Sequence, residues 1–583
     1  EFLRSVVKNY SNEDRLKWLF VFPNRRSEVF FQRYLSEELR AEGQKAAFIP
    51  QMTTISDLFS DLYEEGTLSD KIDLLLELYE VYAANYKGER VDTIDEFIFW
   101  GDVILNDFND VDKYKADPEQ IFTNISDLKD LEGDYSFLSP EQRTALEKLI
   151  GSLKIKNGEK KYHKEFLKIW NILLPVYKGF NKVLKEKRMA YEGMVFRSIA
   201  DRLQKESALG MIQEVYPDPE KVVFVGLNAL TECEKDLLTA LDKQQAAEFW
   251  WDYPQGGEEW LNDPFNKSSF FLKDNVEKYQ NKYDEKIVTQ PKINVVTVAS
   301  DIAQAKLLPN IIEHLGEDFN PERTVVVLPD EGLLNPVLTS IPDSVETVNI
   351  TMGYPLTNTQ AFTLIQDICS LFDVKKSGYF YHRPVWNIRG SSRHADTRSQ
   401  EDAARVTAVK KDARTYIKAA ELDFCDIFHL PCSTDIDAVC VYLRDIVDDI
   451  ARKTSFQRER QALFEIYKCI NKLRSKNLNL KFSTFRSLLL SFISTISLPF
   501  KGEPVEGLQI MGPLEIRALD FDNVIILSSM EGVFPRKSVS NSFIPYIIRK
   551  AFNLPTYEYQ DAVWAYYFYR MIRRAKNVWM VYD

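Results

Sequence analysis

The stretch from Leu508 to Tyr582 brings together residue types that handle phosphate groups in α/β proteins. Asp520 and Asp522 come just before an apolar run, Asn523–Ser528, which predicts a strand covered on both faces. A helix is predicted over Gln560–Lys576, and its last turns carry Arg570, Arg573, Arg574 and Lys576. A final short strand closes the chain. A strand, a loop, a helix that ends in arginines and another strand are typical of the end of a nucleotide-handling domain, because guanidinium groups bind phosphate oxygens well.

Length, composition and charge limit the class of protein. The chain has 583 residues, enough for about four domains of ~150 residues, and its 45% hydrophobic and 28% charged content is ordinary for a globular protein. No apolar run reaches the ~18 residues that span a bilayer, so no membrane partner is expected. The six cysteines have no CxxC spacing and no histidine partner at metal-ligand spacing, which argues against disulfides and zinc and favours a cytoplasmic location. The net charge of −13 excludes a uniformly basic nucleic-acid coat but permits a local basic groove.

Earlier in the chain, predicted strands alternate with predicted helices. The strands share short apolar, β-branched runs: Trp18–Phe22, Ala46–Ile49, Lys221–Val225, Ala247–Trp251, Lys292–Val298, Thr324–Leu328 and Val348–Thr351. The helices expected around them are Phe2–Tyr10, Glu28–Ala41, one that begins at Thr54 or Ser56, one that begins at Thr231 with a capping box to Glu234, and Asp301–His314. This order predicts an α/β fold with parallel sheets, in which ligands bind at the carboxyl ends of the strands.

Two long regions are predicted to be mainly helical, and they divide the strands into two groups. We therefore expect two parallel-sheet domains, each interrupted by a mainly helical insertion. The expected bounds are 1–90 with 201–290 for the first domain, 91–200 for its insertion, 291–360 with 501–583 for the second domain, and 361–500 for its insertion.

The helical insertions carry blocks of charge that have two interpretations. Residues 92–134 are strongly acidic and residues 154–187 strongly basic. The two blocks could pair with each other or lie on solvated faces, or the basic one could face a nucleic acid. The Arg-rich passage Asn387–His394 and the basic residues after it are open to the same two interpretations.

Six stretches, in order along the chain, carry a resemblance to a known family. They are VFPNRRS (21–27), IPQMTTISDL (49–58), VFVGLN (223–228), VNITMGYPLTNT (348–359), the segment from RALDFD onward (517–526) and YRMIRRAK (569–576). Together they resemble the helicase-like half of AddB, a subunit of the AddAB helicase–nuclease, and more distantly superfamily-one helicases such as RecB. The closest likeness is to a Bacteroidetes-type variant, in which this region precedes a PD-(D/E)XK nuclease domain in one chain.

The resemblance implies a fold, a process and partners. The two sheets would be RecA-like domains, and the parent chain would be a PD-(D/E)XK exonuclease acting in the processing of DNA double-strand break ends and in recombinational repair. DNA, as single strands or duplex ends, and an AddA/RecB-like motor subunit would be the partners. Mg²⁺ would be needed only by the nuclease domain, so no cofactor and no metal is expected in this region.

The chain departs from the family pattern where nucleotide chemistry is done. The phosphate-loop motif G-x-x-x-x-G-K-[ST] does not occur. We therefore expect that such a loop either never existed in this protein or lies upstream of Glu1. The strand that should end in paired carboxylates is followed by Gly226, Leu227 and Asn228. Arg517 stands where the fifth motif has its lysine, and no nuclease motif or cluster-binding cysteine set is present. We therefore expect no catalytic residue in this region.

Two sets of residues are candidates for binding. The resemblance places DNA contacts at Asn24, Arg25, Arg26, Arg33, Thr53 and Thr54. It places a degenerate nucleotide site at Asp520, Asp522, Glu531, Arg573 and Arg574. One of the two arginines would be the arginine finger of an active helicase, but both could equally be a cationic helix end favoured by the helix dipole.

Three functions remain open at this point. The first is a degenerate helicase-like, DNA-binding scaffold. The second is an active ATP-dependent DNA translocase whose phosphate loop lies upstream of Glu1. The third is a pure interaction scaffold for an AddA-like motor.

Overall fold

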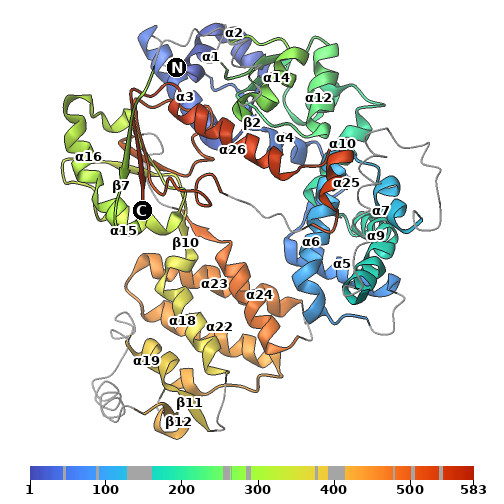
Figure 1. The fold of residues 1–583 in the computed structure, drawn as a ribbon, viewed down its shortest axis with the longest axis vertical. Helices are drawn as coiled ribbons and strands as arrows, with labels where there is room; N and C mark the ends of the chain where they lie inside the picture. The colour runs from blue at the N-terminus through green and yellow to red at the C-terminus, as the bar shows by residue number, and fades with distance from the viewer. Residues whose placement is uncertain are drawn as a thin grey trace. The chain divides into compact units, whose positions relative to one another are not determined.

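The fold is described by a computed structural model, which places residues 1–43, 48–86, 91–127, 160–253, 263, 266–283, 290–373, 378–390, 414–423, 425–476, 480–499, 506–536 and 542–583. The chain divides into two units. The first unit is Glu1–Asn349 with Glu503–Asp583, and the second is Ile350–Gly502 (Figure 1). The fold is α/β with parallel sheets, as the sequence predicts.

A four-stranded parallel sheet begins the first unit, in the order β2-β1-β5-β6. Its strands are β1 (Trp18–Phe22), β2 (Gln51–Thr54), β5 (Lys221–Val225) and β6 (Ala247–Trp250). Three of them confirm the predicted positions. The strand expected over Ala46–Ile49 lies partly outside the described residues, and its described part, Phe48 and Ile49, is exposed and not in a strand. The pairing begins after Pro50, at Gln51 opposite Leu19. The position predicted from the apolar run was therefore wrong, and the strand lies later in the chain.

The helices around this sheet begin where side chains cap them. They are α1 (Phe2–Asn9), α2 (Asn12–Lys17), α3 (Arg25–Ala41), α4 (Ile55–Asp61), α12 (Glu232–Lys243) and α14 (Phe270–Lys278). Helix α3 starts earlier than predicted because the Oδ1 atom of Asn24 accepts the Ser27 N–H at 2.9 Å. Thr54, and not Ser56, caps α4. The capping box of Thr231 and Glu234 on α12 is confirmed.

The region between α4 and β5 is mainly helical. It contains α5 (Lys71–Asn85), α6 (Ile94–Lys113), α7 (Pro118–Asp127), α9 (Lys160–Glu186), α10 (Glu192–Arg202) and α11 (Ala208–Val215), with the short parallel pair β3 (Thr67–Leu68) and β4 (Met189–Ala190). Residues 128–134 of the acidic block and 154–159 of the basic block lie outside the described residues. Within the described part, Lys178 on α9 pairs with Glu119 at 2.5 Å, which favours pairing between the blocks. Lys187 pairs at 2.5 Å with Glu77, which precedes the acidic block.

A six-stranded sheet with the order β7-β16-β15-β8-β14-β9 forms the rest of the first unit. Its strands are β7 (Lys292–Thr297), β8 (Thr324–Val327), β9 (Val348–Ile350), β14 (Leu508–Met511), β15 (Asn523–Ile526) and β16 (Asn577–Tyr582). The strand β14 was not predicted, although it is fully buried and pairs in parallel with β8. The helices are α15 (Asp301–Lys306), α16 (Leu308–Leu315), α17 (Leu334–Leu338), α25 (Tyr546–Ala551) and α26 (Tyr557–Ile572). The single helix predicted over Asp301–His314 is therefore two, because Pro309 starts a new one.

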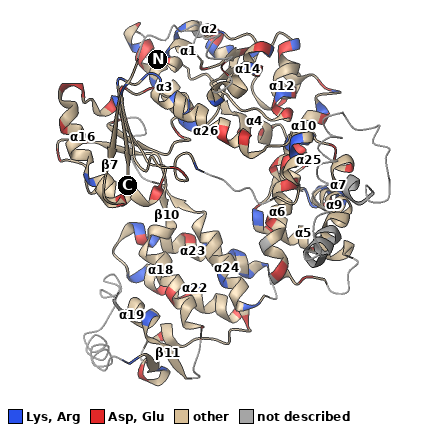
Figure 2. Ribbon diagram, in the orientation of Figure 1, with Lys and Arg blue, Asp and Glu red and all other residues tan. Residues whose placement is uncertain are grey.

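The second unit is a helical body with two small antiparallel strand pairs. Its helices are α18 (Gln360–Leu371), α19 (His382–Gly390), α22 (Ile436–Lys453), α23 (Gln457–Ser475) and α24 (Phe482–Ser494). The pairs are β10 (Tyr354–Pro355) with β13 (Ser497–Leu498), and β11 (Tyr379–Tyr381) with β12 (Tyr416–Lys418). The second half of the Arg-rich passage Asn387–His394, residues 391–394, lies outside the described residues. Acidic and basic residues are interspersed along the helices of each unit (Figure 2).

One hydrophobic core joins the two sheets of the first unit. It contains Phe20 and Phe22 of β1 as well as Val325 of β8 and Ile526 of β15, all fully buried. The two sheets therefore fold as one body, and the loops at the carboxyl end of the first sheet lie against the segment that leads into β15. None of the described helices is both long enough and apolar enough to cross a lipid bilayer.

Candidate functional site

The carboxyl end of the first sheet is closed by a segment of the second. Gly226 follows β5 in a left-handed conformation, with φ of +69°. A Cβ atom at this position would lie 3.1 Å from the Cβ of Ala518 and 3.2 Å from the ring of Phe2. Glycine is thus required twice, by the backbone angle and by the close approach. The edge where an open parallel sheet usually binds ligands is here packed against residues 512–520.

Five charged side chains are buried at this junction and form an arginine–aspartate cluster: Asp252, Asp520, Arg570, Arg573 and Arg574. Asp252 lies two residues after β6, and Asp520 precedes β15. Arg570 is in the last turn of α26, and Arg573 and Arg574 follow that helix. Arg574 bridges both carboxylates, because its Nη2 lies 2.6 Å from Asp252 Oδ1 and its Nη1 lies 3.0 Å from Asp520 Oδ1. Arg570 Nη1 is 2.8 Å from Asp520 Oδ1, and Arg573 Nη1 is 3.5 Å from Asp252 Oδ1.

The surroundings of Asp520 keep it ionised despite complete burial. Burial opposes the charge, but the guanidinium of Arg574 outweighs it and holds the pKa of Asp520 well below its ordinary value. The backbone N–H of Phe2 also donates to Asp520 Oδ2, at 2.9 Å. A carboxylate of the protein therefore occupies the N-terminal end of α1, a position that commonly binds phosphate groups. Arg574 also donates to the hydroxyl of Tyr283, at 3.0 Å.

The structure brings together three of the five residues predicted for a degenerate nucleotide site, namely Asp520, Arg573 and Arg574. Asp522 lies apart from them and pairs with Arg323 at 2.5 Å and with Lys576 at 3.1 Å. Glu531 is exposed and follows the carboxyl end of β15, whereas Asp520 and Asp522 precede its amino end.

Sequence reasoning missed Asp252 and did not assign Arg570 to the site. Asp252 offered a signal, because it is a carboxylate directly after a predicted strand of the first sheet. The signal for Arg570 was weaker, since a basic residue in the last turns of a helix is usually solvated. Its burial follows from the packing of α26 against the loop before β15, where its Nη1 also donates to the Leu519 carbonyl at 2.9 Å.

Three of the predicted DNA-binding residues have structural roles. Asn24 caps α3, and its Nδ2 donates to the carbonyl of Leu514 at 3.2 Å. Thr54 caps α4. The hydroxyl of Thr53 is buried and accepts a hydrogen bond from Tyr216 at 3.1 Å. These side chains hold the loops of the first sheet in place.

The three predicted DNA-binding arginines differ in exposure. Arg33 pairs with Glu37 at 2.9 Å and with Glu322 at 2.5 Å. Arg26 is half-buried, and burial lowers its pKa. Arg25 has a side chain that is 79% exposed, and it pairs with Asp57 at 3.3 Å. Arg25 is therefore the most accessible of the predicted DNA contacts.

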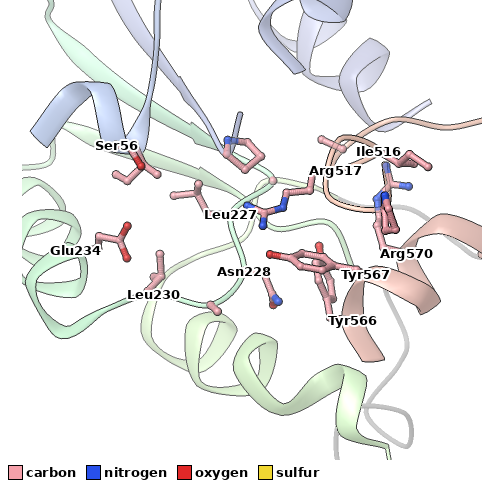
Figure 3. A pocket seen from close by; sticks show the side chains of 16 residues that line it. Ser56, Leu227, Asn228, Leu230, Glu234, Ile516, Arg517, Tyr566, Tyr567 and Arg570 are labelled. Atoms are coloured by element: carbon pink, nitrogen blue, oxygen red, sulfur yellow. The ribbon is translucent and has the colours of Figure 1, made fainter. Parts of the chain in front are cut away.

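A pocket of about 170 Å³ lies beside the arginine–aspartate cluster. Most of its walls come from the loop Gly226–Leu230 after β5, the segment from Pro513 to Ala518, and α26, and the rest come from Pro23, the start of α4 and Glu234 of α12. Figure 3 shows the guanidinium of Arg517 between Leu227 and the ring of Tyr567, with Asn228 beside them. The guanidinium carbon of Arg517 lies 4.5 Å from the centre of that ring. The volume is below the roughly 300–1,000 Å³ of sites for larger small-molecule ligands.

Metal-binding side chains are not grouped in the described parts of the chain. There, no three or more His, Cys, Asp or Glu side chains are arranged to hold an ion. The cysteines are free thiols, and four of them are buried. A comparison with protein-family models finds no match, and neither does a comparison with curated proteins.

Proposed function

We propose that this chain is a helicase-derived, DNA-binding scaffold of AddB type that does not hydrolyse nucleotide. In this proposal its two parallel sheets are RecA-like domains, and it serves in the processing of DNA double-strand break ends. The observation that carries the proposal is the arginine–aspartate cluster, because it closes the junction of the two sheets with the protein's own charges.

The cluster leaves its arginines unsuited to a nucleotide. Arg574 is held by Asp252 and Asp520, and both carboxylates are buried. Turning such a guanidinium toward a phosphate would leave buried carboxylates unpaired, at a cost of about 3–5 kcal/mol. The adjoining pocket is also small for a nucleoside triphosphate. The sequence supports the same conclusion, since it holds no phosphate-loop motif.

Arg25 supports the DNA-binding part of the proposal. It lies at the start of α3, at the carboxyl end of the first sheet, and its partner Asp57 is itself 40% exposed. A surface pair of this kind contributes about 0–1 kcal/mol, so a DNA phosphate can replace Asp57 at little cost. Contacts of this type position a nucleic acid without reading its sequence.

The test is a measurement of DNA binding, with a matched control at a residue that flanks the other end of β1. Fluorescence anisotropy of labelled single-stranded and forked DNA would compare the wild type with Arg25→Ala and Lys17→Ala. Lys17 is also exposed and paired, with Glu220 at 3.4 Å, but it precedes the opposite end of β1. We expect R25A to weaken binding several-fold and K17A to leave it unchanged. Equal effects of the two changes, or no binding by the wild type, would contradict the proposal.

A second candidate is an interaction scaffold for an AddA-like motor that does not touch DNA. It is favoured by the internal roles of Asn24, Thr53 and Thr54, which already have partners within the protein. Absence of DNA binding together with capture of a purified AddA-like motor would support this candidate over the first.

A further inference from the structure

The pocket beside the arginine–aspartate cluster contains a buried side chain without a partner. Asn228 is 7% exposed, and neither its Oδ1 nor its Nδ2 has a hydrogen-bond partner among the described residues. Its backbone is fixed, since the carbonyl accepts a hydrogen bond from Asn275 Nδ2 at 2.7 Å. Leaving a buried polar group unpaired destabilises the folded protein, because the group loses its hydrogen bonds to water. A ligand or ordered water in the pocket would remove this destabilisation.

Arg517 brings a positive charge to the same pocket. Its side chain makes no ion pair within the described residues, and its buried Nε has no hydrogen-bond partner there. The ring of Tyr567 holds the guanidinium in place through a cation–π contact at 4.5 Å. A half-buried guanidinium without a carboxylate is uncommon, because burial of a charge is costly without a partner.

The other groups around the pocket strengthen its positive character. In the neighbouring cluster three guanidiniums face two carboxylates, which leaves one positive charge unbalanced. Burial raises the pKa of Tyr567, so its hydroxyl stays protonated and can donate a hydrogen bond. The one carboxylate in the lining, Glu234, is bound to its helix cap through Thr231, and burial raises its pKa.

We propose that this pocket binds a phosphate-class oxyanion, held by the Arg517 guanidinium, the Asn228 amide and the Tyr567 hydroxyl. The three groups supply one charge and several hydrogen-bond donors from different sides of a space with room for a small anion (Figure 3). The anion can come from free inorganic phosphate or from the 5′-phosphate of a DNA strand. The site does not depend on the DNA-binding role of Arg25.

The test measures phosphate binding directly, by calorimetry and by the shift of the melting temperature in sodium phosphate against sodium chloride of equal ionic strength. The variants are Arg517→Gln, Asn228→Asp and Tyr567→Phe. Arg4→Gln is the matched control, because Arg4 also lies over a tyrosine ring, Tyr34 at 4.3 Å, but is paired with Glu37. Circular dichroism without phosphate shows whether each variant is folded.

We expect phosphate to raise the melting temperature of the wild type and of R4Q. R517Q and N228D should bind phosphate about tenfold or more weakly, since each loses a charge-assisted hydrogen bond or gains a repulsive charge. Y567F should fold normally and show a smaller loss. No phosphate-specific shift in the wild type, which is the result if water alone fills the pocket, would overturn the proposal. So would equal binding by folded R517Q.

Competition with short oligonucleotides identifies the source of the anion. If a 5′-phosphorylated strand displaces phosphate and its 5′-hydroxyl counterpart does not, the pocket binds DNA ends. If neither displaces it, the pocket binds free phosphate. Both outcomes support the site, and R25A should leave phosphate binding unchanged in either case, which separates this proposal from the one above.

Discussion

At the scale of single residues, Asp520 and Asp522 have opposite surroundings although only one position separates them. Asp520 is buried among arginines and accepts a hydrogen bond from the backbone N–H of Phe2. Asp522 is partly exposed and pairs with Arg323 and Lys576. In the sequence the two look like a matched pair of carboxylates. In the folded chain only Asp520 belongs to the junction between the sheets.

This difference predicts unequal losses of stability. Asp520→Asn should lower the free energy of unfolding by about 3–5 kcal/mol, because it leaves buried arginines short of a counter-charge. Asp522→Asn should cost about 1 kcal/mol or less, as for other partly exposed pairs. Urea unfolding followed by fluorescence would measure both. Similar losses in the two variants would show that Asp520 does not hold the junction.

Glu515, in the same segment, predicts a dependence of stability on pH. Burial raises its pKa from 4.5 to about 7. A carboxyl group whose pKa is higher in the folded state stabilises the protein below its unfolded pKa, and this contribution is lost as pH rises through the folded pKa. The free energy of unfolding of the wild type should therefore fall relative to Glu515→Gln between about pH 4.5 and 7, by about 3 kcal/mol at most. A constant difference over this range would contradict the prediction.

At the scale of elements, a buried ion pair joins α6 to α25. Asp107 of α6 accepts hydrogen bonds from the Ser542 hydroxyl at 2.5 Å and from the Phe543 N–H at 2.7 Å. Arg549 of α25 lies 3.1 Å from Asp107 Oδ1 and also pairs with Asp110. Through these contacts the first helical region is attached to the segment before α26, more than four hundred residues along the chain.

Breaking this pair should loosen α25. Arg549→Met leaves Asp107 buried without its counter-charge and should lower the free energy of unfolding by about 3–5 kcal/mol. Adding Asp107→Asn should recover part of that loss, so the double variant should be more stable than the sum of the single changes. Hydrogen exchange across α25 would report the local opening. Arg474→Met, which removes an exposed pair with Asp437, is the control and should cost about 1 kcal/mol or less.

At the scale of the whole molecule, charge limits how DNA can bind. The net charge is −13, and acidic and basic residues are interspersed in each unit (Figure 2). The proposed DNA binding would therefore rest on a few local phosphate contacts. For about three to five contacts with single-stranded DNA, the logarithm of the binding constant should fall with the logarithm of the salt concentration with a slope of about −2 to −4. Anisotropy titrations at several salt concentrations would measure it. A slope near zero would exclude phosphate contacts as the basis of binding.

The sequence by itself determined the local elements and the fold class. Apolar, β-branched runs located β1, β5, β8 and β15, since such runs favour buried parallel strands. The cap at Thr231 could be predicted because capping depends on residues within one turn, whereas for α4 the sequence left Thr54 and Ser56 both open. The strand β14 was not predicted, because its four residues show no clear hydrophobic pattern and form a strand only by pairing with β8.

Only the tertiary structure decided which charges meet. Arg574 and Asp252 are separated by 322 positions, and no local pattern links them. The common core of the two sheets brings them together and removes them from water. Each buried charge then needs the other as its counter-charge, because an unpaired buried charge is strongly destabilising. The same packing leaves the Arg517 Nε and the Asn228 side-chain amide facing one pocket without hydrogen-bond partners in the described chain. The sequence identified the arginines of α26 as phosphate-binding residue types, and the fold assigned them to the protein's own aspartates.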